Sequence, residues 1–171
     1  QEKTITLDIG KQLGKMLERN LNMKVIYTRE EDVFVPLWKR TKIANSASGD
    51  LFISIHANST SKSSKIKGFE TFLLRVGKTE DAVEVAKREN SVIALEEPTH
   101  QYVDLNDAKL ILATMSQNAD MKASEELASF IQNNLDKKLT SKNRGVKQAG
   151  FHVLVGASMP NVLVEVGFIS N

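Results

Sequence analysis

The chain contains 171 residues, a length that favours a single domain with one hydrophobic core. Hydrophobic residues make up 41% and charged residues 26%, as in typical globular proteins, so disorder, collagen and coiled coil are excluded. Lys and Arg number 23 against 21 Asp and Glu, and the net charge of +2 gives no reason to expect a nucleic-acid partner. No apolar stretch approaches the roughly 18 residues of a membrane span, so no transmembrane segment is expected.

The absence of cysteine narrows the chemistry that the chain can perform. Without Cys it can form no disulfide, no thiolate metal site and no Cys nucleophile. Any metal must therefore be held by histidine and carboxylate side chains.

The first half of the chain shows helical and strand patterns in alternation. Apolar residues spaced three and four apart predict a helix, and short apolar or β-branched runs predict strands. The predicted elements are a helix over 4–20, a strand over 25–27, a helix from 36 to about 48, and a central strand over 51–56.

The second half continues the alternation. It predicts a strand over 68–74, a helix around 80–94, a longer and broken helix over 104–139, and two last strands over 151–155 and 162–166. Strands that alternate with helices indicate an α/β fold, here a single twisted mixed sheet with helices on both faces plus a helical insertion. In such sheets, chemistry gathers where strands end and loops begin.

That rule selects His56, which closes an apolar strand, and Glu165, a lone charge within the last strand. The two other histidines are less promising, because His100 lies in a predicted loop and His152 alternates with core residues. Burying an unpaired carboxylate costs several kcal/mol, so Glu165 must meet a cation, a metal-bound water or a solvated cleft. The alternative for Glu165 is a structural salt bridge to one of the arginines 29, 40 and 144.

Five segments form a specific pattern in this order. They are EKTITLDIGKQL at the start, TREEDVFVPLWKRTKIAN (28–45), DLFISIHAN (50–58), KGFETFLL (67–74) and NRGVKQAGFHVLVGASMPNVLVEVGFISN (143–171). Together they resemble the zinc-dependent N-acetylmuramoyl-L-alanine amidases of the amidase-3 type, which are bacterial cell-wall hydrolases. The resemblance runs over nearly the whole chain and implies that residues 1–171 form one amidase catalytic domain.

The resemblance also implies the roles of particular residues. Glu2 and His56 match two zinc ligands of the family, and Glu165 matches its catalytic glutamate. Asn58 follows the SIHA motif and is expected to contact the substrate. The family's third ligand is a His in an HGG-type motif, which does not occur in this sequence. That His and the family's first strand are expected upstream of Gln1; the alternative is that the protein lacks the motif.

Residues 78–127 resemble the regulatory insertion of cell-division amidases, in which a helix covers the zinc cleft until an activator protein moves it. Glu96 or Glu97 could supply a blocking carboxylate there, while Val92, Ile93 and Leu95 pack over the cleft. The alternative is that this segment is ordinary solvated helix surface. A partner that relieves the covering helix is therefore expected together with peptidoglycan.

The leading hypothesis is a zinc enzyme that cuts between N-acetylmuramic acid and the first L-alanine of the peptide stem, in cell-wall remodelling or daughter-cell separation. The alternative is a non-catalytic peptidoglycan-binding or scaffold protein that retains the amidase fold. A zinc hydrolase with a different amide substrate is a third reading. The expected location is the periplasm or extracellular cell wall of a bacterium, with a signal peptide upstream, and the expected state is a monomer.

Overall fold

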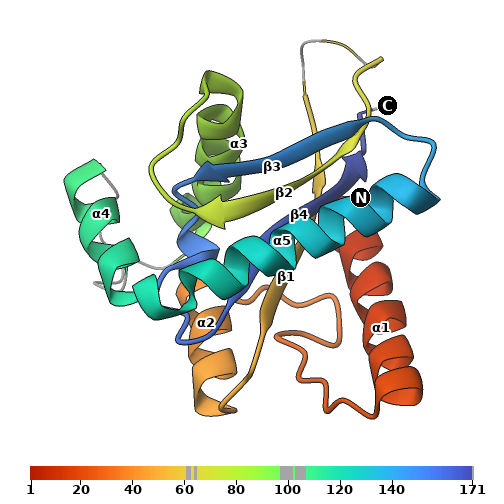
Figure 1. The fold of residues 1–171 in the computed structure, drawn as a ribbon, viewed down its shortest axis with the longest axis horizontal. Helices are drawn as coiled ribbons and strands as arrows, with labels where there is room; N and C mark the ends of the chain where they lie inside the picture. Colours follow the sequence, from red (N-terminus) through yellow and green to blue (C-terminus); the bar gives the residue numbers. More distant parts are fainter. Residues whose placement is uncertain (61–62, 64, 97–101, 103–106, 171) are drawn as a thin grey trace.

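The computed structural model describes residues 1–171 except 61–62, 64, 97–101, 103–106 and 171. Figure 1 labels its elements in chain order, with η marking a 3-10 helix in the text. They are α1 (Glu2–Leu21), α2 (Leu37–Ser46), β1 (Phe52–Asn58), β2 (Phe69–Leu74), α3 (Glu80–Asn90), η1 (Ser91–Leu95), α4 (Asp107–Ser116), α5 (Asn118–Lys138), β3 (Asn143–Ala149), η2 (His152–Leu154) and β4 (Asn161–Phe168).

The strands form one mixed sheet in the order β1-β4-β2-β3. Strand β4 runs parallel to β1 and antiparallel to β2, and β2 runs parallel to β3. Strand β4 therefore has a neighbour on each side, and its first five residues are buried. The expected single mixed sheet is confirmed.

The alternation of side chains along β4 divides the core between the two faces of the sheet. Val162 and Val164 pack on the face that α5 covers, together with Leu73. Leu163 belongs to the larger cluster on the opposite face, which includes residues of α2, α3 and η2. Helices therefore lie on both faces, as the sequence predicts (Figure 1). Glu165 follows Leu163 by two positions and shares its face, the face of α3.

The short strand predicted over 25–27 is wrong. These residues are not in a strand, and Ile26 is 47% exposed. A strand needs a neighbour for its backbone hydrogen bonds, and the sheet of the described residues offers none at this position. The side chain of Tyr27 packs instead against Gly14 of α1.

The strand predicted over 151–155 is also wrong, and β3 takes its place in the sheet. Residues 152–154 form the 3-10 turn η2, in which Phe151, Val153 and Leu154 are all buried. A compact turn between sheet and helices can bury neighbouring side chains, whereas a strand directs them to alternate faces. The segment Asn143–Ala149 is polar and was not predicted as a strand, yet it pairs with β2.

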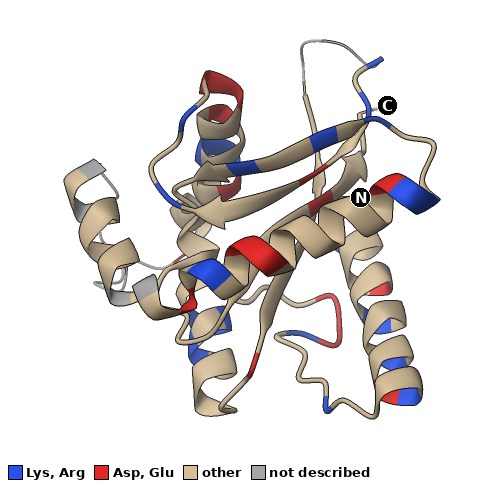
Figure 2. Ribbon diagram, viewed as in Figure 1, with Lys and Arg blue, Asp and Glu red and all other residues tan. Residues whose placement is uncertain are grey.

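The helices between β2 and β3 agree with the sequence prediction. Helix α3 continues into η1 where one helix is expected around 80–94. The broken helix predicted over 104–139 corresponds to α4 and α5 from residue 107 on, and its first residues, 104–106, lie outside the described residues. Figure 2 shows acidic and basic residues interspersed along α1 and α3, in keeping with the small net charge. In the described part of the chain, no helix is both long and apolar enough to cross a lipid bilayer. The limits of the insertion, 78–127, stay a prediction.

Candidate metal and catalytic site

Three strands bring polar side chains into one row across the sheet. His56 on β1 pairs with Glu165 on β4, and Glu165 pairs with Glu70 on β2. Side chains of residues directly opposite each other point to the same face. His56 is 9% exposed, Glu70 1% and Glu165 0%. The row is therefore buried, on the face of the sheet toward α3.

Glu2 approaches this row from the first turn of α1. Its Oε1 lies 3.3 Å from His56 Nδ1 and accepts a hydrogen bond of 3.3 Å from the backbone N–H of Ala57. Helix α1 packs beside β1, where Gly10 faces Ile55. The structure thus brings Glu2 into contact with His56, and it places Glu165 on the adjacent strand.

Glu89 completes the cluster, and the sequence analysis missed it. Its Oε2 lies 2.8 Å from His56 Nδ1, and ligand atoms of Glu2, His56 and Glu89 all lie within 4.8 Å of one another. Helical spacing could have found it: Ala82, Val85 and Ala86 form the buried stripe of α3, and position 89 continues that stripe. A carboxylate on the apolar face of a helix needs a partner in the interior.

The cluster changes the protonation of its members. Burial opposes a charge on His56, but Glu2 and Glu89 outweigh it and raise the pKa of His56 to about 9. Burial raises the pKa of Glu165 to about 8; the charge of His56 counteracts this rise, whereas Glu89 and Glu2 add to it. For Glu2, burial alone would raise the pKa, but His56 and the N–H of Ala57 lower it overall.

The orphaned polar atoms of the row fit a metal ion. Neither ring nitrogen of His56 and neither carboxylate oxygen of Glu165 has a hydrogen bond of good geometry among the described residues. Two carboxylates converge on one nitrogen of His56, which could donate a proton to one of them at most. One imidazole nitrogen with carboxylate oxygens is a ligand set that zinc accepts. Glu165 stands beside this set as a buried acid without an ion-pair partner.

The arginines offered as alternative partners of Glu165 lie elsewhere in the structure. Arg144 ion-pairs with Glu70 at 3.5 Å, and Arg40 donates to the carbonyl oxygen of Val35 at 3.1 Å. Arg29 donates to the carbonyl oxygens of Lys3 and Glu31. The salt-bridge alternative therefore has no support in the described residues.

Other residues expected at the site have different surroundings. The carboxylate of Glu96 accepts hydrogen bonds from the backbone N–H of Leu37 and from the hydroxyl of Tyr102, so it lies at the start of α2 and not at His56. Asn58 is 1% exposed, and its side chain bonds to Glu70 and Arg88. Glu97 and His100 lie outside the described residues.

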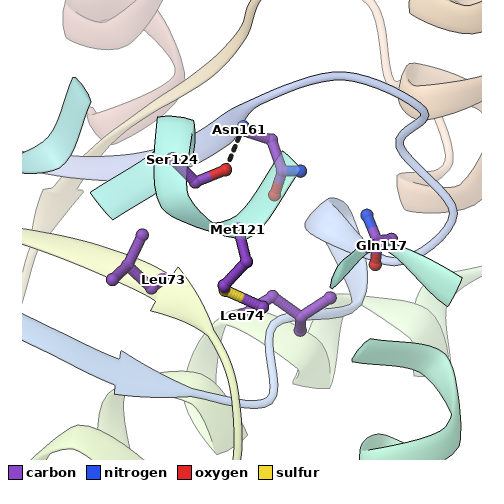
Figure 3. A pocket seen from close by; sticks show the side chains of 6 residues that line it. All are labelled: Leu73, Leu74, Gln117, Met121, Ser124 and Asn161. Atoms are coloured by element: carbon purple, nitrogen blue, oxygen red, sulfur yellow. Dashed lines mark hydrogen bonds between the residues drawn. The ribbon is translucent and has the colours of Figure 1, made fainter. Parts of the chain in front are cut away.

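A small cavity lies at the opposite end of β4 from Glu165. Figure 3 shows it between α5 and the sheet, where Ser124 Oγ accepts a 3.0 Å hydrogen bond from the N–H of Asn161. It has room for about one water molecule and contains no titratable side chain, so it is a packing feature. Its lining residues are Leu73, Leu74, Gln117, Met121, Ser124 and Asn161.

The fold and the site together define an α/β domain with a cluster of Glu2, His56 and Glu89 that could hold a metal ion. The family model described as N-acetylmuramoyl-L-alanine amidase matches residues 1–171. The amidase AmiC of Escherichia coli is 34% identical over 176 residues, and the match covers 100% of this chain. The amidase AmiA of the same species is 33% identical over 175 residues, again with 100% of this chain covered. The chain therefore belongs to the N-acetylmuramoyl-L-alanine amidase family.

Solved structures agree with this assignment. The amidase AmiC2 of Nostoc punctiforme is 28% identical, with a TM-score of 0.66 over 98% of this chain and 67% of that one. An amidase from Clostridium difficile 630 is 24% identical and has the same fold, with a TM-score of 0.68 over 99% of this chain and 68% of that one. The chain spans 41% of the length of E. coli AmiC and 59% of AmiA.

Proposed function

We propose that this chain is a zinc-dependent amidase domain that hydrolyses the bond between N-acetylmuramic acid and L-alanine in peptidoglycan. The observation that carries the proposal is Glu165, a fully buried carboxylic acid with no ion-pair partner in the described structure, beside the Glu2–His56–Glu89 cluster. A scaffold that merely binds peptidoglycan has no need of an acid in that position. Membership of the amidase family supports the choice of substrate.

Glu2 and His56 would hold the zinc ion in this proposal. When bound, zinc would polarise the amide carbonyl group and lower the pKa of a water molecule to about 7. Glu165 accepts a proton from water while the water oxygen attacks the carbonyl carbon of the lactyl group. As the C–N bond breaks, Glu165 gives that proton to the departing nitrogen of alanine. Its raised pKa suits a group that must both accept and return a proton.

In the conformation described here, α3 covers the cluster with Glu89. We propose that this is a closed state, in which Glu89 takes a ligand position that catalysis requires to be open. The residue expected in this role was Glu96 or Glu97, but the contact with His56 is made by Glu89. An activator protein that favours the open state by a few kcal/mol would release the site. The physiological setting that we propose is daughter-cell separation in the periplasm or at the extracellular cell wall.

Digestion of purified sacculi tests the proposed activity. A chain extended upstream to include an HGG-type histidine, with Glu89→Gln to open the site, should release muropeptide stems that begin with a free L-alanine amino group. The matched control adds His56→Ala, which should abolish that release together with zinc binding while the sheet remains folded. Release of glycan fragments with intact stems, or of stems cut at another amide, would contradict the proposal.

A further inference from the structure

Glu70 is a buried carboxylate that the proposed chemistry does not use. It is 1% exposed and lies opposite Glu165 in the pairing of β2 with β4. Its Oε1 accepts a 2.7 Å hydrogen bond from Asn58 Nδ2, and its Oε2 lies 2.7 Å from Lys147 Nζ. Both oxygens are therefore engaged, as a buried charge requires.

A bulge in β3 brings two cations to this carboxylate. Phe69 pairs with Asn143 and Thr71 with Val146, so two residues of β3 lie opposite the single residue Glu70. One of the two is Gly145, whose φ of +81° suits glycine. The extra residue shifts the alternation of side chains. Arg144 and Lys147, three positions apart, therefore both reach Glu70, at 3.5 and 2.7 Å.

Two series of side-chain contacts connect Glu70 to the two ends of α3. Lys147 Nζ also pairs with Asp81, in the first turn of α3, at 2.5 Å. Asn58 Oδ1 accepts a 2.6 Å hydrogen bond from Arg88, in the last turn, and Arg88 also donates to the carbonyl oxygen of Ser59 at 2.7 Å. Positions 81 and 88 are seven residues apart, which is two helical turns, so both contacts come from one face of α3.

We propose that Glu70 is a positioning residue that fixes α3, and through it Glu89, over His56. Arg88 and Glu89 are neighbours in the chain, so the bond from Arg88 to Asn58 also sets where the Glu89 carboxylate lies. Neutralising Glu70 removes the anion that orients both Lys147 and Asn58, so the contacts that Asp81 and Arg88 make with these two side chains weaken. The effect on hydrolysis rests on the proposed function, whereas the effect on the placement of α3 does not.

Hydrogen exchange of the metal-free chain tests the proposal without any assay of activity. Glu70→Gln and Asp81→Asn should each raise amide exchange in residues 83–90 by about tenfold, the change that corresponds to ~1.4 kcal/mol of local stability. Exchange in β4 should stay unchanged. Amide exchange in the double variant should be no faster than in Glu70→Gln alone, because both substitutions interrupt the same contacts through Lys147. Glu80→Gln is the control, since it removes an exposed acid from the same turn without touching Lys147.

A pair of spin labels gives a second readout that general loss of stability would not imitate. The chain has no cysteine, so Lys87→Cys on α3 and Glu126→Cys on α5 provide one labelled pair at exposed positions. The distance distribution should broaden with Glu70→Gln and stay narrow with Glu80→Gln. Unchanged distributions and unchanged exchange in α3 would overturn the proposal. If Glu70→Gln increases amide exchange throughout the sheet, the Asp81→Asn variant is the deciding one. An increase in amide exchange confined to α3 in that variant supports the proposal, and no increase overturns it.

Discussion

Glu70 and Glu165 face each other on neighbouring strands and are both buried, but their surroundings differ. Glu70 is neutralised by Lys147 and Arg144 and bonded to Asn58. Glu165 has no such partner in the described structure, and burial raises its pKa. Two glutamates one strand apart can thus serve different purposes, because pairs of acids in unlike environments separate into structural and proton-transferring groups.

Glu165→Gln should separate proton transfer from metal binding. The amide keeps the size of the side chain but cannot accept a proton, so turnover of the opened, extended enzyme should fall by roughly 10²-fold or more. Zinc measured by atomic absorption should stay bound at the level of the unsubstituted protein. A matching loss of zinc would show that Glu165 is a ligand, contrary to the role proposed here.

The raised pKa of Glu165 also predicts how the stability of the metal-free chain depends on pH. In the unfolded chain the carboxyl group has its ordinary pKa of 4.5, whereas in the folded chain the pKa is raised to about 8. Between these values the folded state binds more protons, so the free energy of unfolding should fall as pH rises. Urea denaturation from pH 5 to 8 should show this decline, and Glu165→Gln should make it shallower. An equal slope in both proteins would contradict the assignment.

At the scale of elements, the sequence predicted those helices and strands whose hydrophobic residues follow a regular spacing. The stripes of α1 and α3 and the apolar runs of β1 and β4 each specify their element and the face it buries. Strand β3 was not predicted, because Arg144, Lys147 and Gln148 make this segment polar. These side chains form ion pairs and a hydrogen bond that exist only once the sheet is assembled. Residues 151–155 were misjudged because a short apolar run has no periodicity to separate a strand from a buried turn.

The same limit applies to the site. His56 and Glu165 stand out as polar residues in apolar strands, and family resemblance added Glu2. Glu89 was missed because its meaning depends on where α3 lies, and the placement of α3 is set by contacts between residues far apart in sequence. Helical spacing places Glu89 on the buried stripe of α3, but it does not indicate that the carboxylate meets His56.

Helix α1 offers a matched pair of glycine substitutions. A Cβ at Gly14 would lie 2.6 Å from Cζ of Tyr27, whereas one at Gly10 would meet its nearest neighbour, Ile55 Cδ1, at 3.9 Å. Gly14→Ala should therefore displace the tyrosine ring and lower the free energy of unfolding by about 1–3 kcal/mol. Gly10→Ala should instead raise it by up to ~1 kcal/mol, because alanine favours helix. Thermal denaturation of the two variants checks the contrast, and equal effects would refute it.

At the scale of the whole molecule, the cluster unites the start of α1, the end of β1 and the end of α3. The affinity of the chain for zinc should therefore depend on whether these three segments are held together in the closed state. Calorimetric titration should show that Glu89→Gln weakens zinc binding to this chain by at least about tenfold, since a two-ligand site replaces a three-ligand one. Glu80→Gln, on the same helix, should leave the affinity unchanged. Equal affinities for the unsubstituted chain and Glu89→Gln would show that Glu89 is not a ligand.

The position of β4 between a parallel and an antiparallel neighbour has a consequence for how the sequence can vary. Adding or deleting one residue early in β4 would rotate every later side chain to the other face of the sheet. Glu165 would then point into the apolar layer beneath α5, and the valines would point toward His56. The amino-acid composition would hardly change, yet the acid would be lost from the site. Length changes should accumulate in the connections between elements, while the spacing from Asn161 to Glu165 stays fixed.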